Sequence, residues 1–149
     1  MCDEIEVAWA AGLLEGEGSF VKRHVHSSAI TCSSTDLDTL EKLASIFGGN
    51  IVKLKKRKSH WKDAWAWYVS GQKAYNVMGK ILPFMMCRRS KQIVVVMKRW
   101  EKHNAAIMSR KQTGQAAVAY YKSMTKPSLR KAGAKYGISY ESVRRALKT

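Results

Sequence analysis

The hydrophobic pattern of this chain changes between a helical and an extended period in a fixed order, which limits the folds open to it. A helical pattern precedes two extended segments, and the same unit occurs again before a third helical pattern. Helical patterns occur over 3–14, 35–47 and 72–81. Extended patterns occur over 19–33, with a turn near Ser27 and Ser28, and over 50–58 and 61–70. This order predicts an α+β fold with an αββαββα core.

Residues beyond Pro83, which breaks the third helix, are expected to be helical again. One helix is predicted over 88–103, and a second, over 104–123, would connect the core to the C-terminal residues. The predicted division of the chain is a core over 1–103, a helical connector over 104–126 and a separate segment over 127–149.

The first helix has a face without large side chains. Ala8, Gly12 and Gly16 are four residues apart, so they lie on one side and allow another backbone to approach closely. Gly16 and Gly18 then end the helix.

The net charge of the chain points to an anionic partner. Lys and Arg number 27 against 11 Asp and Glu, a formal charge of +16, and nucleic acid is the usual partner of such a surplus, with an anionic membrane second. The sequence contains no apolar run near the roughly 20 residues that span a bilayer. The acidic N-terminus does not fit a signal peptide, and three widely spaced cysteines form no disulfide framework. We therefore expect an intracellular protein of the cytoplasm, nucleoid or organelle matrix that is not secreted and does not bind membranes.

Acidic residues are concentrated at the start of the chain, where five of the eleven fall within the first seventeen positions. Glu17 lies between two glycines at the end of the first helix, so its carboxylate could project into an open site that suits Mg²⁺. Two such helices packed through their small faces would bring two carboxylates together, as metal-assisted phosphodiester hydrolysis requires. The alternative is a helix end with a solvated carboxylate.

The stretch from Ala10 to Gly18, with Trp9 before it and Ser19 and Phe20 after it, resembles the motif of the LAGLIDADG homing endonucleases. The αββαββα order also matches, and the resemblance covers Glu4 to Lys102. It implies a saddle-shaped antiparallel sheet that reads DNA, with Glu17 as the metal ligand in place of the family's terminal aspartate. Ala8, Gly12 and Gly16 would lie in the helix–helix seam.

The resemblance also implies roles for other residues near Glu17. Glu15 matches a position that is more often structural than catalytic. Lys91 resembles a lysine found after the second pair of strands, where it positions or activates water; a phosphate-contacting or solvated lysine is an equal alternative. Ser34 falls where the family often has glutamine. Because only one motif is present, the resemblance implies a homodimer with Glu17 near the twofold axis and a partly palindromic target site.

Basic residues on the predicted strands are candidates for DNA contacts, with a merely solvated charged face as the alternative. The set is Lys22, Arg23, His24, His26, Lys53, Lys55, Arg57 and Lys62. Alternation would place Lys53, Lys55 and Arg57 on one face. A cluster of Trp61, Trp65 and Trp67 is interpreted as core in preference to a base-stacking platform.

The C-terminal residues 128–148 resemble a helix-turn-helix module. Ala132 is small at the expected helix crossing, Gly137 turns the chain, Ser139 caps the second helix and Val143 faces inward. That helix would present Tyr140, Ser142, Arg144 and Arg145 to DNA. A generic amphipathic helical hairpin is the alternative.

The sequence thus predicts a homodimeric, Mg²⁺-dependent endonuclease that makes a staggered double-strand break in a long DNA site. Enzymes of this kind are typically encoded within introns or as free-standing mobile genes, often in phage or microbial genomes. No organic cofactor and no small-molecule substrate are expected. The alternative is a non-cleaving binder with the same fold, either a regulator or an intron-splicing maturase, and a further one is a basic structural DNA protein without sequence preference.

Overall fold

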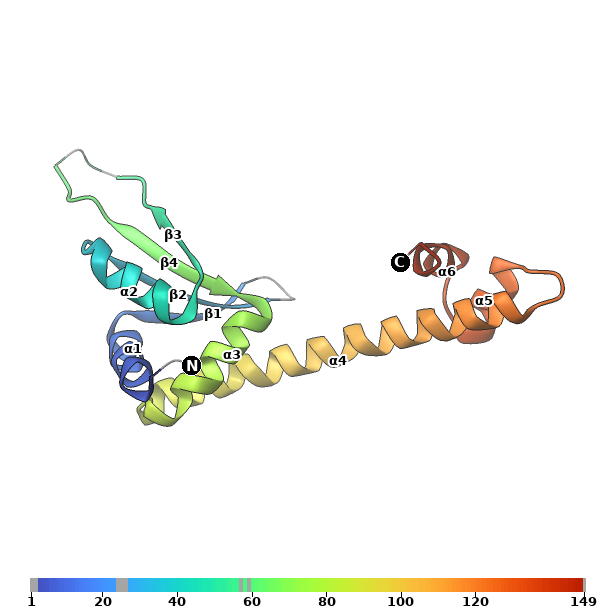
Figure 1. Cartoon of the computed structure of the whole chain (residues 1–149), viewed down its shortest axis with the longest axis horizontal. Coiled ribbons are helices and arrows are strands. Elements are labelled where there is room, and N and C mark those ends of the chain that lie inside the picture. Colours follow the sequence, from blue (N-terminus) through green and yellow to red (C-terminus); the bar gives the residue numbers. More distant parts are fainter. Residues whose placement is uncertain (1–2, 24–26, 57, 59, 149) are drawn as a thin grey trace. The chain divides into compact units, whose positions relative to one another are not determined.

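A computed structural model of the chain describes residues 3–23, 27–56, 58 and 60–148. Its elements are α1 (Glu4–Gly16), β1 (Gly18–Arg23), β2 (Ser27–Ser34), α2 (Leu37–Phe47), β3 (Asn50–Lys53), β4 (Trp65–Ser70), α3 (Gly71–Ile81), the 3-10 turn η1 (Leu82–Phe84), α4 (Cys87–Ser123), α5 (Leu129–Tyr136) and α6 (Tyr140–Ala146) (Figure 1). The α+β class and the αββαββα order are confirmed. No helix in the described part of the chain is both long and apolar enough to cross a membrane.

The chain divides into two compact units, Met1–Glu101 and Lys102–Thr149, and the boundary falls inside α4. The first unit holds the sheet, α1 to α3 and the start of α4. The second holds the remainder of α4 with α5 and α6. One hydrophobic core in this second unit contains residues from both the expected connector over 104–126 and the segment over 127–149. The division of the chain into three parts remains a prediction.

The four strands form one antiparallel sheet in the order β1-β2-β4-β3, so the two hairpins meet through β2 and β4. The turn expected near Ser27 and Ser28 was wrong, because both residues belong to β2, where they pair with Arg23 and Lys22. The second hairpin is shorter than expected, since β3 ends at Lys53 and β4 begins only at Trp65. Four basic residues and no apolar residue follow Leu54 directly in the sequence, so this stretch lacks the alternation that holds a strand against a core.

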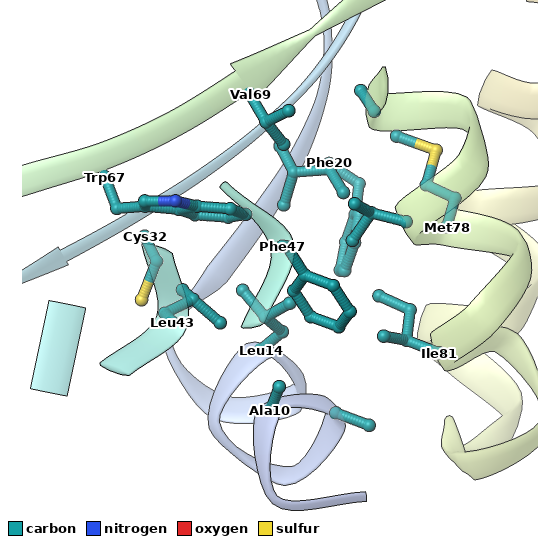
Figure 2. Packing of buried hydrophobic residues seen from close by; sticks show 14 of the residues in the cluster. Ala10, Leu14, Phe20, Cys32, Leu43, Phe47, Trp67, Val69, Met78 and Ile81 are labelled. Atoms are coloured by element: carbon teal, nitrogen blue, oxygen red, sulfur yellow. The ribbon is translucent and has the colours of Figure 1, made fainter. Parts of the chain in front are cut away.

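One face of the sheet carries the core of the first unit (Figure 2). Phe20, Ile30, Cys32, Trp67 and Val69 alternate along β1, β2 and β4 and pack against the apolar faces of the helices. From the helices come, among others, Leu14 of α1, Leu43 and Phe47 of α2, and Met78 and Ile81 of α3. Burial of these residues fixes which face of the sheet remains available for a ligand.

Helix α4 is continuous over 37 residues, whereas the sequence analysis divided the same stretch into two helices. No proline interrupts it. Its glycine, Gly114, is tolerated inside the helix and lies close to α6, because a Cβ added there would be 3.4 Å from the Cβ of Ala146. The helical pattern was therefore read correctly, and the predicted break at residue 103 was wrong.

The second unit has the helix–turn–helix arrangement that the C-terminal sequence predicts. Ser128 caps α5 by accepting the Lys131 N–H, Gly137 adopts the left-handed conformation after it (φ +65°), and Ser139 caps α6 by accepting the Ser142 N–H. Ala132 and Val143 are fully buried together with Ala117 of α4, and Val118, Tyr120, Tyr121, Met124, Leu129, Tyr136 and Ile138 pack around them.

Candidate active site and DNA-binding surface

Glu17 is the residue at which the chain leaves α1 and enters the sheet. Its N–H donates to the carbonyl oxygens of Leu13 and Leu14, so its backbone is the C-cap of the helix, while its side chain is exposed. The next residue must be glycine, because a Cβ at Gly18 would overlap the carbonyl of Leu14. This tight exit leaves the Glu17 side chain exposed at the end of α1, and its role as a metal ligand remains a prediction.

The small-residue face of α1 is open in the single chain. A Cβ added at Gly12 or at Gly16 would meet no atom within 4 Å, and both residues are exposed. Ala8, one turn earlier, is half-buried. This part of α1 therefore has room for another backbone, which is the geometry that the seam prediction requires.

The start of α4 is attached to the end of α1 beside Glu17. The Met86 N–H donates to Oε2 of Glu15 (3.2 Å), so this carboxylate lies at the positive N-terminal end of α4. Arg89 donates through Nε to the Glu15 carbonyl (3.0 Å) and through Nη2 to the Gly16 carbonyl (3.5 Å). The Glu15 side chain thus joins two helices, in keeping with the structural position that it was expected to match.

Lys91 lies in the first turns of α4, within the stretch over 88–103 that the sequence predicts to be helical. Its side chain is exposed, while Arg89 and Gln92 on the adjoining face of α4 are half-buried and contact α1 and β1. A role for Lys91 remains a prediction. The contacts of Arg89 with α1 were missed because Glu15 and Gly16 lie more than seventy positions away in the sequence, beyond the reach of any local pattern.

Cys32 and not Ser34 is the β2 residue beside Glu17. It pairs with Gly18 in the sheet and is 1% exposed. Burial, and to a smaller extent the negative charge of Glu17, raise the pKa of the Cys32 thiol. The Ser34 hydroxyl instead accepts the Asp36 N–H at the start of α2 (3.0 Å).

The donor set around Glu17 is compatible with Mg²⁺ only if other oxygen atoms complete it. The described residues of one chain contain no group of three His, Cys, Asp or Glu side chains that could hold a metal ion. Mg²⁺ usually retains several waters and is held by one or two carboxylates together with substrate phosphates. An exposed carboxylate on each of two chains fits that pattern.

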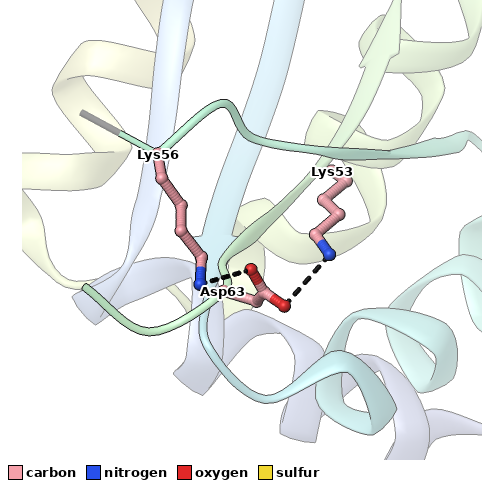
Figure 3. Close-up of polar contacts among 3 residues, drawn as sticks. All are labelled: Lys53, Lys56 and Asp63. Atoms are coloured by element: carbon pink, nitrogen blue, oxygen red, sulfur yellow. Dashed lines mark hydrogen bonds and ion pairs between the residues drawn. The ribbon is translucent and has the colours of Figure 1, made fainter. Parts of the chain in front are cut away.

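Two of the cations near the β3–β4 connection are bound to an acid. Lys53 and Lys56 each lie 3.0 Å from an oxygen of Asp63, which holds both ammonium groups (Figure 3). The two hydrogen bonds, first from Lys53 and then from Lys56, lower the pKa of Asp63. Lys53 is the last residue of β3 and shares its face of the strand with the core-packing Ile51, so the alternation that was expected to align Lys53 with Lys55 does not extend beyond Lys53.

The other basic candidates have different settings. Lys55 and Lys62 are exposed in the β3–β4 connection, and Lys22 and Arg23 lie in β1 opposite Ser28 and Ser27. His24, His26 and Arg57 lie outside the described residues.

The sheet face opposite the core carries mainly uncharged side chains among the described residues. Its members alternate with the core residues of the same strands: Ser19 and Val21 of β1, Thr31, Ser33 and the buried Ala29 of β2, Asn50 and Val52 of β3, and Ala66, Tyr68 and Ser70 of β4. Because the hydroxyl and amide groups of this face carry no net charge, the charge pattern of the sequence did not point to them. The two-residue alternation of β2 and β4 was the signal that could have found them.

The three tryptophans of the second hairpin do not behave alike. Trp67 is fully buried and donates through Nε1 to the Gly48 carbonyl (2.8 Å), and Trp65 packs against the core. Trp61 is 48% exposed in the connection, next to Lys62. The assignment of this cluster to the core holds for the first two and is wrong for Trp61.

The four candidates on α6 are all exposed but lie on different sides of the helix. Ser142 and Arg145 line a cavity of about 720 Å³ between α4 and α6, together with Arg110 and Lys111 of α4, whereas Tyr140 and Arg144 are not among its lining residues. The lining contains three cations and no acidic side chain. This side of the second unit suits an anionic ligand.

Comparison with solved structures places this fold among homing endonucleases. The homing endonuclease I-CvuI in complex with an I-CreI target matches with a TM-score of 0.54 and 20% identity, covering 97% of this chain and 94% of that one. The archaeal intron-encoded homing endonuclease I-Vdi141I in complex with DNA matches with a TM-score of 0.52 and 15% identity, covering 97% and 96%. No protein-family model and no curated protein matches the sequence. The chain has the homing-endonuclease fold, as the resemblance implied.

Proposed function

We propose that this protein is a site-specific homing endonuclease that cleaves both strands of duplex DNA by metal-assisted phosphodiester hydrolysis. The observation that carries the proposal is the position of Glu17, an exposed carboxylate at the open end of a glycine-faced helix, within the homing-endonuclease fold. The net charge of +16 supports DNA as the partner.

The chemistry requires two copies of Glu17. We place the face formed by Ala8, Gly12 and Gly16 against its copy in a homodimer, which brings the two carboxylates together at the twofold axis. Each carboxylate would bind Mg²⁺ jointly with a scissile phosphate. The metal would supply an activated water and neutralise the charge on the reacting oxygens. Lys91 is proposed to contact a phosphate or a water nearby.

Binding of the DNA is assigned to both units. The sheet face opposite the core and the basic β3–β4 connection would lie against the groove, with Lys22, Arg23, Lys55 and Lys62 contacting phosphates or bases. The exposed Tyr140, Ser142, Arg144 and Arg145 of α6 would add contacts from the second unit. A twofold protein with two such surfaces fits a long, partly palindromic site on intracellular DNA and a staggered break.

A randomised duplex library tests the proposal, because no target sequence needs to be known. The purified chain is incubated with the library with and without Mg²⁺, and cleaved molecules are selected and sequenced. The expected result is Mg²⁺-dependent enrichment of one sequence with a fixed offset between the two cuts. Glu17→Gln should abolish cleavage while retaining binding, and Glu41→Gln, which removes an exposed acid of α2, should cleave normally.

The same experiment separates the alternatives. Selective binding of one sequence without cleavage by the intact chain, with any divalent ion, would favour a regulator or a maturase. Binding without sequence preference and with a steep salt dependence would favour a basic structural DNA protein.

A further inference from the structure

Arg89 of α4 donates two hydrogen bonds to the last turn of α1 and a third to Gln92 of its own helix. Its Nε donates to the Glu15 carbonyl (3.0 Å) and its Nη2 to the Gly16 carbonyl (3.5 Å), while Nη1 donates to Oε1 of Gln92 (3.2 Å). The guanidinium also lies 5.9 Å from the centroid of the Phe20 ring. Arg89 is half-buried, so these contacts are only partly open to water.

The two carbonyls that Arg89 binds belong to the end of α1, where carbonyl groups lack partners within the helix. They immediately precede Glu17 in the sequence. A planar guanidinium with several donors in a fixed arrangement can hold both carbonyls at once, which a single ammonium group cannot do with the same geometry. Arg89 therefore restrains the backbone on the N-terminal side of Glu17.

Gln92 restrains the C-terminal side. Its Nε2 donates to the Phe20 carbonyl of β1 (3.1 Å), three residues beyond Glu17, while its Oε1 accepts from Arg89. The pair of side chains from α4 thus spans the segment from Glu15 to Phe20. Glu17 lies in the middle of that segment, and its own side chain stays free to face solvent.

We infer that Arg89, supported by Gln92, is a positioning residue that holds the Glu17 carboxylate in the orientation needed to bind the metal. This inference rests on the proposed function for its consequence, but the restraint itself is a property of the chain without metal or DNA. Partners that orient a metal ligand commonly contribute about 10- to 100-fold to metal affinity or activity.

Amide hydrogen exchange of the full chain, without metal or DNA, tests the restraint directly. Arg89→Met keeps most of the side-chain length but removes every donor, and it should speed exchange at the Glu17 and Gly18 amides about 5- to 10-fold. Arg89→Lys keeps the charge, and its exchange rates at these amides should lie between those of the unaltered chain and those of Arg89→Met. The matched control is Arg99→Met, which removes the same charge from an exposed position of α4. Equal exchange in Arg89→Met and Arg99→Met would overturn the inference.

Single-turnover cleavage of a selected site tests the consequence. Arg89→Met should lower the cleavage rate about 10- to 100-fold and raise the Mg²⁺ concentration for half-maximal rate, with DNA affinity in Ca²⁺ equal to that of Arg99→Met. Faster exchange with an unchanged rate and unchanged metal dependence would reduce Arg89 to a structural residue and overturn the positioning role. If the unaltered chain cleaves no DNA, the proposed function fails, and the exchange measurement still decides whether Arg89 holds Glu17.

Discussion

The Nζ atom of Lys53 lies 3.0 Å from Oδ2 of Asp63, so a cation counted from the sequence as a DNA contact is already bound to an acid of the same hairpin. Lys56 binds the other oxygen of that carboxylate at the same distance. Two positive charges are therefore partly neutralised where the chain leaves β3. Asp63 should therefore weaken the nonspecific attraction for DNA that the proposed function assigns to this hairpin.

Replacing Asp63 should strengthen nonspecific DNA binding. In Asp63→Asn the ammonium groups of Lys53 and Lys56 are released, and each that reaches a phosphate should steepen the dependence of log K on log salt by about 0.9. Fluorescence anisotropy with an unrelated duplex at several salt concentrations measures this. Glu41→Gln removes the same charge from α2 and serves as the control. An equal effect of the two substitutions would mean that net charge alone matters.

The Asp63 contact should also have a defined pH range. Because its hydrogen bonds from Lys53 and Lys56 lower its pKa, Asp63 stays ionised in the folded chain at a pH where an unfolded chain would bind a proton. The contribution of ionised Asp63 to the stability of the fold is therefore complete when the pH is above the ordinary pKa of an aspartate. It is lost as the pH falls through the lowered pKa of the folded chain. A carbon-13 NMR titration of the Asp63 carboxyl should give a lower midpoint in the intact chain than in a Lys53→Met, Lys56→Met double variant. Coincident midpoints would contradict the ion pairs.

Two substitutions of Gly12 should affect the folding of the chain and its dimerisation separately. Nothing lies within 4 Å of an added Cβ, so Gly12→Ala should leave the monomer intact and, by helix propensity, stabilise it by up to about 1 kcal/mol. Gly12→Leu should weaken the dimer, because its side chain would occupy the space assigned to the second α1. Thermal unfolding and sedimentation velocity measure the two effects. Ser45→Leu, on the exposed surface of α2, is the control, and a Gly12→Leu dimer as tight as the original would refute the assignment of this face.

Gly133 tests the packing of the second unit. A Cβ there would lie 2.5 Å from the carbonyl oxygen of Ile138, so Gly133→Ala should force α5 and α6 apart and destabilise this unit by about 1–3 kcal/mol. All five tryptophans lie within the first 100 residues, so their fluorescence reports only on the first unit. The substitution should lower the unfolding temperature seen by far-UV circular dichroism, with little change in tryptophan fluorescence. The exposed Ala134→Ser should alter neither signal.

The sequence by itself determined the order of elements and the position of Glu17. Hydrophobic period, glycine at helix ends and capping serines are local properties, so they predict helices, hairpins and the exit from α1 without knowledge of the remaining chain. The same signals predicted the turn at Gly137 and the cap of α6 at Ser139, whereas the cap of α5 at Ser128 was found only in the structure.

Only the tertiary structure decided which side chains surround Glu17 and which cations are free. Arg89 and Cys32 lie near Glu17 because a helix and a strand from elsewhere in the chain approach it, and Asp63 contacts Lys53 across the second hairpin. Such contacts depend on the path of the folded backbone over tens of residues. A periodic pattern records which face of an element is buried but not what lies opposite it.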